Sequence, residues 1–384
     1  MTAVVPLTPA FVRGALRLEP TARGVAPHRL PAWALAQAAD PQLSMVEAQG
    51  AGVRIAMRTA ATSVTLTAHR TRVTYAGAPA RPDGSIDLIV DGDVVRRTRT
   101  SGGTTTELDM VTGQPTVIPG DDLVATFDGL PARVKDVEIW LPHNETLEII
   151  EVTADAPVTE APLVGRRWLH HGSSISQGSN AARPTGTWPA VAARLGGVEL
   201  QNLGFGGAAL LDPFVARVMR DTPADLLSVA LGINLVNSDL MRLRAFRAGL
   251  HGFLDTIRDG HPSTPLLVVT PLHCRIHEAT PGPGAFDTEA IAEGRLAFMA
   301  TGDPAEVPAG RLTLESIRTE TTRLVAERQA TDPHLFLLDG LTLFGAADEA
   351  AHPLRDALHP DAETHRFIGE RFAQHVFTHG PFTS

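Results

Sequence analysis

The sequence contains few cysteines and lysines, and no long apolar runs. A single cysteine, Cys274, excludes an intrachain disulfide framework and a cysteine-rich zinc site. Lys135 is the single lysine, so arginine carries nearly all of the positive charge. Nowhere do about 18 apolar residues follow one another, the length that a membrane-spanning helix needs. The first residues also lack the basic start and apolar run of a signal peptide.

Positive charge is scarce overall. The chain has 43 acidic and 33 basic residues, and its formal net charge is −10. Such a surface repels phosphates, so we expect no nucleic acid and no anionic membrane among the partners. Because the sequence shows neither a signal peptide nor a membrane span, we expect a cytoplasmic protein. The sequence leaves open whether it forms a homo-oligomer.

Length and composition fit a folded protein of more than one domain. The chain has 384 residues, of which 43% are hydrophobic and 20% are charged. At about 150 residues per domain, this length predicts two domains. A polar, proline-bearing stretch at 155–163 separates two regions of different pattern, and we interpret it as a linker.

The region 1–155 has the pattern of an all-β domain. Short stretches of alternating or β-rich residues recur about every ten residues, with Gly, Asp and Pro between them, and this favours an antiparallel sandwich. The only helical pattern is a turn near 33–38. The charged run 96–100 is interpreted as a solvated strand or turn. The predicted strands are 52–58, 62–69, 85–92, 122–129 and 133–140.

The region 164–384 alternates short apolar runs with segments of helical periodicity. Alternation of this kind predicts a parallel sheet covered by helices on both faces, an α/β fold. The predicted strands are 166–171, 198–203, 225–231, 265–270 and 334–340. The predicted helices are 187–196, 243–260, 315–329 and 363–377.

Polar residues and glycines follow each apolar run of this second region. Because ligands bind beyond the carboxyl ends of the strands in an open α/β sheet, we expect these residues to gather at one edge. In chain order they are Ser173, Ser174 and Ser176; Gly204 to Gly207; Asn234; His273, His277 and Glu278; and Asp356 and His359.

These residue types are the components of serine-dependent acyl transfer. A serine hydroxyl becomes nucleophilic when a histidine takes its proton, and a carboxylate on the other ring nitrogen orients that histidine. Asp356 lies three residues before His359, a spacing that lets the carboxylate fold back onto its own histidine. Backbone N–H groups at glycines and an asparagine amide can bind the oxyanion. A G-x-S-x-G elbow is absent, because Ser174 lies in GSSIS.

The four blocks resemble the SGNH, or GDSL-type, esterase superfamily over residues 166–377. The blocks are Gly172-Ser173-Ser174, Gly207, Gly232-Ile233-Asn234 and the stretch from Asp356 to His359. Many members carry aspartate where this chain has Ser173. The resemblance implies that Ser174 is the nucleophile, that His359 is the base and that Asp356 orients it. It further implies that the oxyanion hole consists of the Ser174 and Gly207 N–H groups and Asn234, with Gly206 as the alternative to Gly207.

The resemblance also implies an architecture. A GSS block behind a β-rich region is similar to bacterial two-domain carbohydrate esterases. We therefore expect a jelly-roll-like β-sandwich over 1–155 and a three-layer, doubly wound catalytic domain over 164–384. No cofactor and no metal are expected. Aromatic residues make up only 5% of the chain, so we expect the sandwich to be structural or to form a wall of the site.

For function, we expect a carboxylic ester hydrolase that removes a short acyl group, in particular acetyl, from a sugar or a glycosylated small molecule. The alternative is an acyltransferase or thioesterase of secondary metabolism that uses the same residues. A non-catalytic binding protein is the third hypothesis.

Four further residues are predicted to contact the substrate, and two of them have a structural alternative. His171 either lines the site or packs at a strand end. Trp188 either stacks on the substrate or packs against the sheet. His273 and Glu278 are expected to shape the pocket. Cys274 is interpreted as a small buried hydrophobe.

Overall fold

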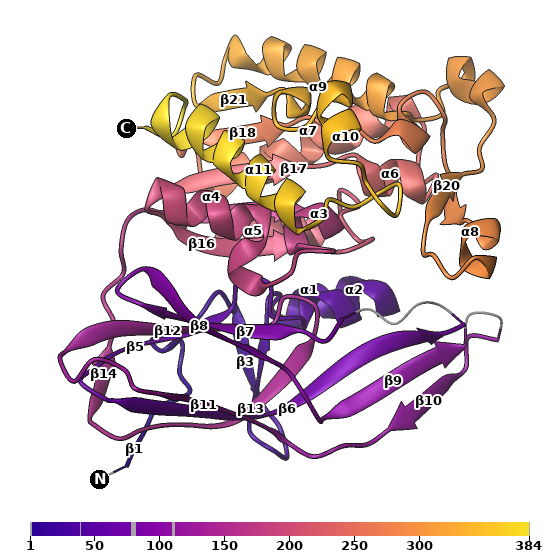
Figure 1. Cartoon of the computed structure of the whole chain (residues 1–384). Helices are drawn as coiled ribbons and strands as arrows, with labels where there is room; N and C mark the ends of the chain where they lie inside the picture. Colours follow the sequence, from indigo (N-terminus) through magenta and orange to yellow (C-terminus); the bar gives the residue numbers. More distant parts are fainter. Residues whose placement is uncertain (1, 39, 78–81, 110–111, 384) are drawn as a thin grey trace. The chain divides into compact units, whose positions relative to one another are not determined.

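The structure of the protein, a computed structural model, describes residues 2–38, 40–77, 82–109 and 112–383. It divides into two compact units (Figure 1). The first unit contains Met1–Ala32, Ser44–Val164 and Ala182–Gly186, and the second contains Trp33–Leu43, Gly165–Ala181 and Thr187–Ser384. Each unit therefore includes a short segment that the sequence pattern assigned to the other region. The domain boundaries at 155 and 164 stay a prediction.

The first unit is built from two β-sheets. The larger sheet has the order β10-β9-β6-β13-β4-β3, with β1 on β13 and β11 on β6. The smaller sheet has the order β14-β5-β12-β7-β8, with β2 on β5. The strands of the larger sheet are β1 (Ala3–Val4), β3 (Arg17–Pro20), β4 (Val25–His28), β6 (Ser63–Ala76), β9 (Thr104–Asp109), β10 (Pro115–Ile118), β11 (Leu123–Asp128) and β13 (Thr146–Ala154). Those of the smaller sheet are β2 (Val12–Arg13), β5 (Arg54–Thr59), β7 (Ser85–Val90), β8 (Asp93–Arg99), β12 (Lys135–Trp140) and β14 (Val158–Glu160).

Alternation of side chains explains why these segments are strands. In β11, Leu123, Ala125 and Phe127 are buried while the residues between them are exposed, which is the period of two of a half-buried strand. The predicted β-rich unit is confirmed. Two details differ from the prediction: β6 pairs with β9 in parallel, and β14 pairs with β5 inside the stretch interpreted as a linker.

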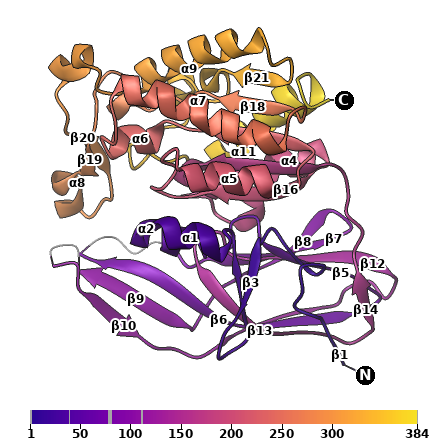
Figure 2. The same ribbon diagram turned by 180° about the vertical axis from the view of Figure 1, so that it is seen from behind.

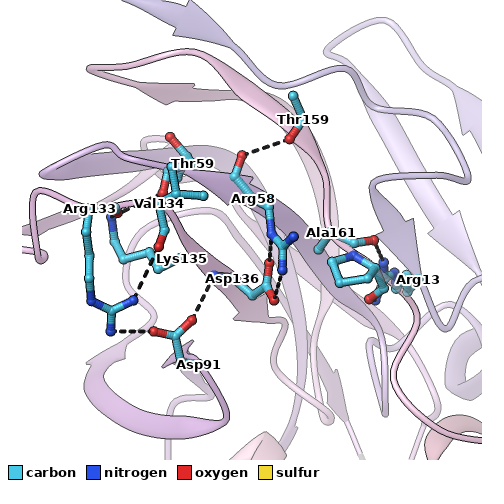
Figure 3. Close-up of polar contacts among 11 residues, drawn as sticks. Arg13, Arg58, Thr59, Asp91, Arg133, Val134, Lys135, Asp136, Thr159 and Ala161 are labelled. Atoms are coloured by element: carbon cyan, nitrogen blue, oxygen red, sulfur yellow. Dashed lines mark hydrogen bonds and ion pairs between the residues drawn. The ribbon is translucent and has the colours of Figure 1, made fainter.

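The single lysine is part of a polar network on the smaller sheet (Figure 3). Lys135 is buried, and its ammonium donates a hydrogen bond of 2.6 Å to the carbonyl of Ala61. Burial and the neighbouring Arg133 lower the pKa of Lys135. Beside it, Arg58 binds Asp136 through two hydrogen bonds of 2.7 and 2.9 Å. Lys135 thus has a structural role, supplying a donor to backbone oxygens at a strand end.

The second unit contains a five-stranded parallel sheet with the order β16-β15-β17-β18-β21. This order reverses direction at β15, as in a doubly wound fold. All five strands lie within one or two residues of the segments predicted from the sequence. The strands are β15 (Arg167–Gly172), β16 (Glu199–Gly204), β17 (Leu226–Ala230), β18 (Leu266–Val269) and β21 (Leu335–Leu338), and a separate hairpin is formed by β19 (Gly284–Phe286) and β20 (Phe298–Ala300).

Helices cover both faces of this sheet. Figure 1 shows α4 (Trp188–Gly196) and α11 (Ala362–Phe372) in front of it, and Figure 2 shows α5 (Pro213–Asp221), α7 (Leu243–Gly260) and α9 (Leu314–Gln329) on the other face. The fold is therefore the predicted three-layer α/β class. The other helices are α1 (Ala32–Ala38), α2 (Pro41–Glu47), α3 (Ser174–Gln177), α6 (Ile233–Asn237), α8 (Thr288–Ala292) and α10 (Ala346–Ala351), and α11 continues into a π-helical segment (Ala373–Thr378).

Aromatic side chains bind the α4 and α11 layer to the sheet. Trp168 of β15 stacks on Phe372 with ring centroids 5.2 Å apart, and Trp188 lies 5.0 Å from the same ring. These three aromatic side chains pack together around β15. They therefore hold in place the strand that ends at the serine block. Among the described residues, no helix is both long and apolar enough to cross a membrane.

Candidate active site

The serine block forms a tight turn between β15 and α3. The strand ends at Gly172, and Ser174 is the first residue of the helix. Ser173 caps the helix by accepting a hydrogen bond of 3.3 Å from the N–H of Ile175. A Cβ on Gly172 would lie 2.2 Å from the Oγ of Ser176, so only glycine fits there. The turn therefore presents Ser174 at the carboxyl edge of the sheet.

Ser174, His359 and Asp356 form one continuous hydrogen-bonded chain. The Oγ of Ser174 lies 3.0 Å from the Nε2 of His359. The Nδ1 of His359 lies 2.8 Å from the Oδ2 of Asp356. All three side chains are largely buried. With the Nδ1 proton donated to the carboxylate, Nε2 of a neutral His359 is free to accept the proton of Ser174.

The turn that carries Asp356 explains how two residues so close in sequence meet. Ala357 adopts a left-handed conformation with φ of 63°, which bends the chain between the carboxylate and the histidine. The Oδ1 of Asp356 then accepts the N–H groups of Leu358 and His359 at 3.0 and 2.7 Å. A non-glycine residue in this conformation is strained, and such strain is typical of functional sites.

Asp356 stays ionised despite its burial. Burial by itself raises the pKa of this carboxyl, but the hydrogen bond and charge of His359, the His359 N–H and the Asn180 amide outweigh it and bring the pKa to about 2. The Nδ2 of Asn180 donates a hydrogen bond of 2.8 Å to Oδ2. The carboxylate is therefore available as a negative partner for a protonated His359 at any ordinary pH.

The asparagine and glycine blocks supply the candidate oxyanion donors, Asn234 and Gly207. The Oδ1 of Asn234 accepts the N–H of Ala209 at 3.2 Å, which fixes the amide and leaves its Nδ2 to donate elsewhere. Gly232 precedes α6 with φ of 143°, a conformation that glycine adopts readily, and a Cβ there would lie 2.6 Å from Pro271. Gly207 has φ of 75°. The structure thus holds both blocks in conformations that their residue types favour.

The predicted substrate contacts have different surroundings. His171 is buried, donates to the carbonyl of Leu203 at 2.7 Å and stacks on Phe253, which fits a packing role. Glu278 forms an ion pair with Arg318 and accepts the N–H of Cys274, so it holds the loop after β18. The placement of His171 favours its structural alternative, and that of Glu278 indicates a structural role where a part in shaping the pocket was predicted.

His273 and Trp188 line a largely apolar cavity next to the serine turn. His273 also lies between two carboxylates, 3.3 Å from Glu278 and 2.9 Å from Glu349. The side chains of Ser174 and His359 are not among the residues that line this cavity. Both predicted contacts therefore adjoin the site, on a different side from the reacting groups. Their contact with a substrate stays a prediction.

Two residues next to the reacting groups were missed by the sequence analysis. One is Asn180, which donates to Asp356 and has a left-handed φ of 65°, a conformation common for asparagine. Phe298 of β20 packs edge-on against the His359 ring at 5.5 Å, and its N–H binds the carbonyl of Asp356. No local pattern indicates Phe298, because the hairpin is far from both blocks in sequence.

Within the described ranges, no three His, Cys, Asp or Glu side chains come together to hold a metal ion.

Replacing Asn234 with alanine is expected to lower kcat for ester cleavage by about 10²- to 10³-fold with little change in KM, because one oxyanion donor is lost. Steady-state kinetics with an aryl ester would measure it. Asn237→Ala, on the same short helix, is the matched control and should leave kcat unchanged. A wild-type kcat in Asn234→Ala would exclude Asn234 from the oxyanion hole.

Part of the second unit matches a known protein family. Residues 166–280 match the GDSL-like lipase/acylhydrolase family. No curated protein matches the chain by sequence.

Solved structures are similar over the whole chain. A salicylyl-acyltransferase, SsfX3, from a tetracycline biosynthetic pathway is 26% identical, with a TM-score of 0.78 over 97% of this chain and 95% of that one. A GDSL-like lipase from Bacteroides ovatus is 17% identical, with a TM-score of 0.65 over 97% of this chain and 96% of that one. A family two carbohydrate esterase from Cellvibrio japonicus is 12% identical, with a TM-score of 0.54 over the same shares of each chain. The second unit of this chain therefore has the SGNH hydrolase-like fold, and residues 166–280 within it are similar to the GDSL-like lipases and acylhydrolases.

Proposed function

We propose that the protein cleaves esters through an acyl-enzyme formed on Ser174. The observation that carries this proposal is the chain of hydrogen bonds from the Ser174 Oγ through the His359 ring to the Asp356 carboxylate, 3.0 and 2.8 Å long. A hydroxyl, an imidazole and a carboxylate in this order are the groups that nucleophilic acyl transfer requires.

Each group has a defined part in the proposed reaction. His359 Nε2 takes the proton of Ser174 as the Oγ attacks the ester carbonyl. The tetrahedral oxyanion is bound by the N–H groups of Ser174 and Gly207 and by the Nδ2 of Asn234. The C–O bond to the alcohol then breaks, and His359 gives its proton to the leaving alcohol. Water or an acceptor alcohol repeats the sequence and releases the acyl group.

For the substrate, we propose a short acyl group, in particular acetyl, on a sugar or a glycosylated small molecule. The two-unit layout supports this, because family two carbohydrate esterases with this layout are named for action on carbohydrates.

A second candidate is an acyltransferase that passes the acyl group to an acceptor other than water. Support comes from the salicylyl-acyltransferase, which is similar at 26% identity over 97% of this chain. Hydrolysis and transfer share every step up to the acyl-enzyme, so the blocks described above fit both.

The test compares p-nitrophenyl acetate with p-nitrophenyl octanoate, with and without an added alcohol, for the wild type and Ser174→Ala. We expect acetate to be the better substrate and the variant to be inactive and unlabelled by a fluorophosphonate probe. If the alcohol accelerates p-nitrophenol release and yields its acetate ester, the acyltransferase is favoured. Equal rates in the wild type and Ser174→Ala would refute the acyl-enzyme proposal.

A further inference from the structure

The oxyanion glycine is held by a residue from a distant part of the chain. The segment Trp33–Leu43 belongs to the second unit, although it lies more than a hundred residues before the serine block. From α2, the Nε2 of Gln42 donates a hydrogen bond of 2.8 Å to the carbonyl of Gly206. Its side chain also covers Gly207: three of its atoms lie 3.4 to 3.7 Å from the position of a Cβ on that glycine.

We propose that Gln42 is a positioning residue for the oxyanion hole, which fixes the peptide between Gly206 and Gly207 so that the Gly207 N–H faces the reacting carbonyl. This inference rests on the acyl-enzyme mechanism proposed above. It adds to that mechanism a side chain that none of the four sequence blocks contains.

Peptide geometry connects the two ends of this contact. In a trans peptide the C=O of one residue and the N–H of the next lie in one plane and point in opposite directions. A donor that holds the Gly206 oxygen therefore turns the Gly207 N–H directly away from Gln42. No acceptor within the described residues takes up this N–H, which leaves it to bind a ligand. A hydrogen bond to the carbonyl also polarises the peptide and strengthens its N–H as a donor.

Gly206 and Gly207 are consecutive glycines, so the peptide between them needs a hydrogen bond such as that from Gln42 to hold its orientation. Glycine has access to both signs of φ, so the peptide between Gly206 and Gly207 can rotate at little cost. Rotation would point the Gly206 oxygen toward the developing negative charge. On the other side, the Gly206 N–H is held by the Oε1 of Gln177 at 2.7 Å. Gln177 and Gln42 thus fix the two peptides that flank Gly206.

The segment that carries Gln42 is itself anchored. The guanidinium of Arg217, on α5, lies 5.1 Å from the centre of the Trp33 ring, and it also binds the Oε1 of Gln37. The Oδ1 of Asp40 accepts the N–H of Gln42 at 2.9 Å. Because α5 directly follows the glycine loop, Gln42 and the loop it binds are attached to the same rigid helix.

The experiment measures kcat, KM and the affinity of an alkyl boronic acid, which adds to the serine and forms a tetrahedral oxyanion mimic. In Gln42→Ala and Gln42→Glu we expect kcat to fall about 10- to 100-fold with KM changed less than about threefold, and boronate affinity to fall by a similar factor. Gln42→Glu keeps the shape but loses the donor. Gln42→Lys keeps a donor and should retain most of the activity.

Gln37→Glu is the matched control on the same segment, because a carboxylate still accepts from Arg217, and it should behave as the wild type. Urea unfolding of each variant separates lost positioning from lost folding. If Gln42→Ala and Gln42→Glu keep wild-type kcat and boronate affinity, the inference is wrong. A changed KM with unchanged kcat and boronate affinity would also overturn it, since Gln42 would then be a substrate contact. Loss of activity in Ser174→Ala together with unchanged Gln42 variants would overturn this inference alone, whereas an active Ser174→Ala would refute the proposed function first.

Discussion

Replacing His359 with alanine is expected to lower kcat for ester hydrolysis by about 10⁴- to 10⁶-fold, because Ser174 loses the base that takes its proton. The short path from the Ser174 Oγ to the His359 Nε2, 3.0 Å, is the geometry that the substitution removes. Steady-state and pre-steady-state hydrolysis of p-nitrophenyl acetate would measure the loss. The kcat of Asp356→Asn should fall by less, about 10²- to 10⁴-fold, because Asp356 acts only through the histidine.

His334→Ala gives the matched control, since that histidine is exposed on the loop before β21. It should retain wild-type kcat and a wild-type rate of labelling by a fluorophosphonate. A His359→Ala enzyme that keeps more than a tenth of the wild-type kcat would show that another group activates the serine. In that case the hydrogen bonds around His359 would be structural.

The sequence contained enough to place the catalytic blocks but not their support. Each block follows a short, buried parallel strand, and the topology of such a sheet brings the strand ends together whatever the intervening sequence. Asp356 and His359 are three residues apart, so their pairing is local. Ser174 and Asn234 needed only the correct order of strands. The fold was predicted correctly because the pattern of its strands is local, while the catalytic roles of these residues stay a prediction.

The hydrogen bonds that orient the groups of the site depend on long-range packing. No sequence pattern near either of the two bonded residues indicates them. Asn180 reaches Asp356 across 176 residues, and Gln42 reaches Gly206 across 164. Either side chain would be an unremarkable polar residue in an isolated segment. The same reason explains the parallel pairing of β6 and β9, because only the complete sheet determines which edge β9 joins.

The fold is also expected to lose stability steeply in mild acid, by about 4 kcal/mol between pH 6.5 and pH 5. Three histidines of β15 and α11 are almost fully buried: His170, His171 and His365. Burial is the main cause that lowers their pKa values from 6.5 to about 3, about 4 and about 4, respectively. His170 lies between the hydroxyls of Ser228 and Ser176, each 2.8 Å away. The folded core therefore favours the neutral form of His170.

The direction of the effect follows from proton binding. Below pH 6.5 the unfolded chain takes up protons on these histidines while the folded protein does not, so the free energy of unfolding falls as the pH falls. Each histidine contributes about 1.5 kcal/mol over this range. Asp212 works in the opposite direction, because burial and the charge of Asp40 raise its pKa to about 6 and the folded state then binds a proton first. This offsets about 1 kcal/mol of the loss.

Urea unfolding at pH 7, 6 and 5 would measure the free energy of unfolding, and its slope against pH counts the protons taken up. His365→Gln is the informative variant. Its amide can still donate toward the carbonyl of Ser179, which His365 Nε2 contacts at 2.9 Å, but it cannot be protonated. The variant should be less stable than the wild type at pH 7 and should lose about 1.5 kcal/mol less between pH 6.5 and pH 5. A wild-type free energy of unfolding that stays constant down to pH 5 would contradict the prediction. Since His170 and His171 lie on the strand that ends at Ser174, acid unfolding should remove the catalytic geometry together with the core, and activity and folding should be lost at the same pH.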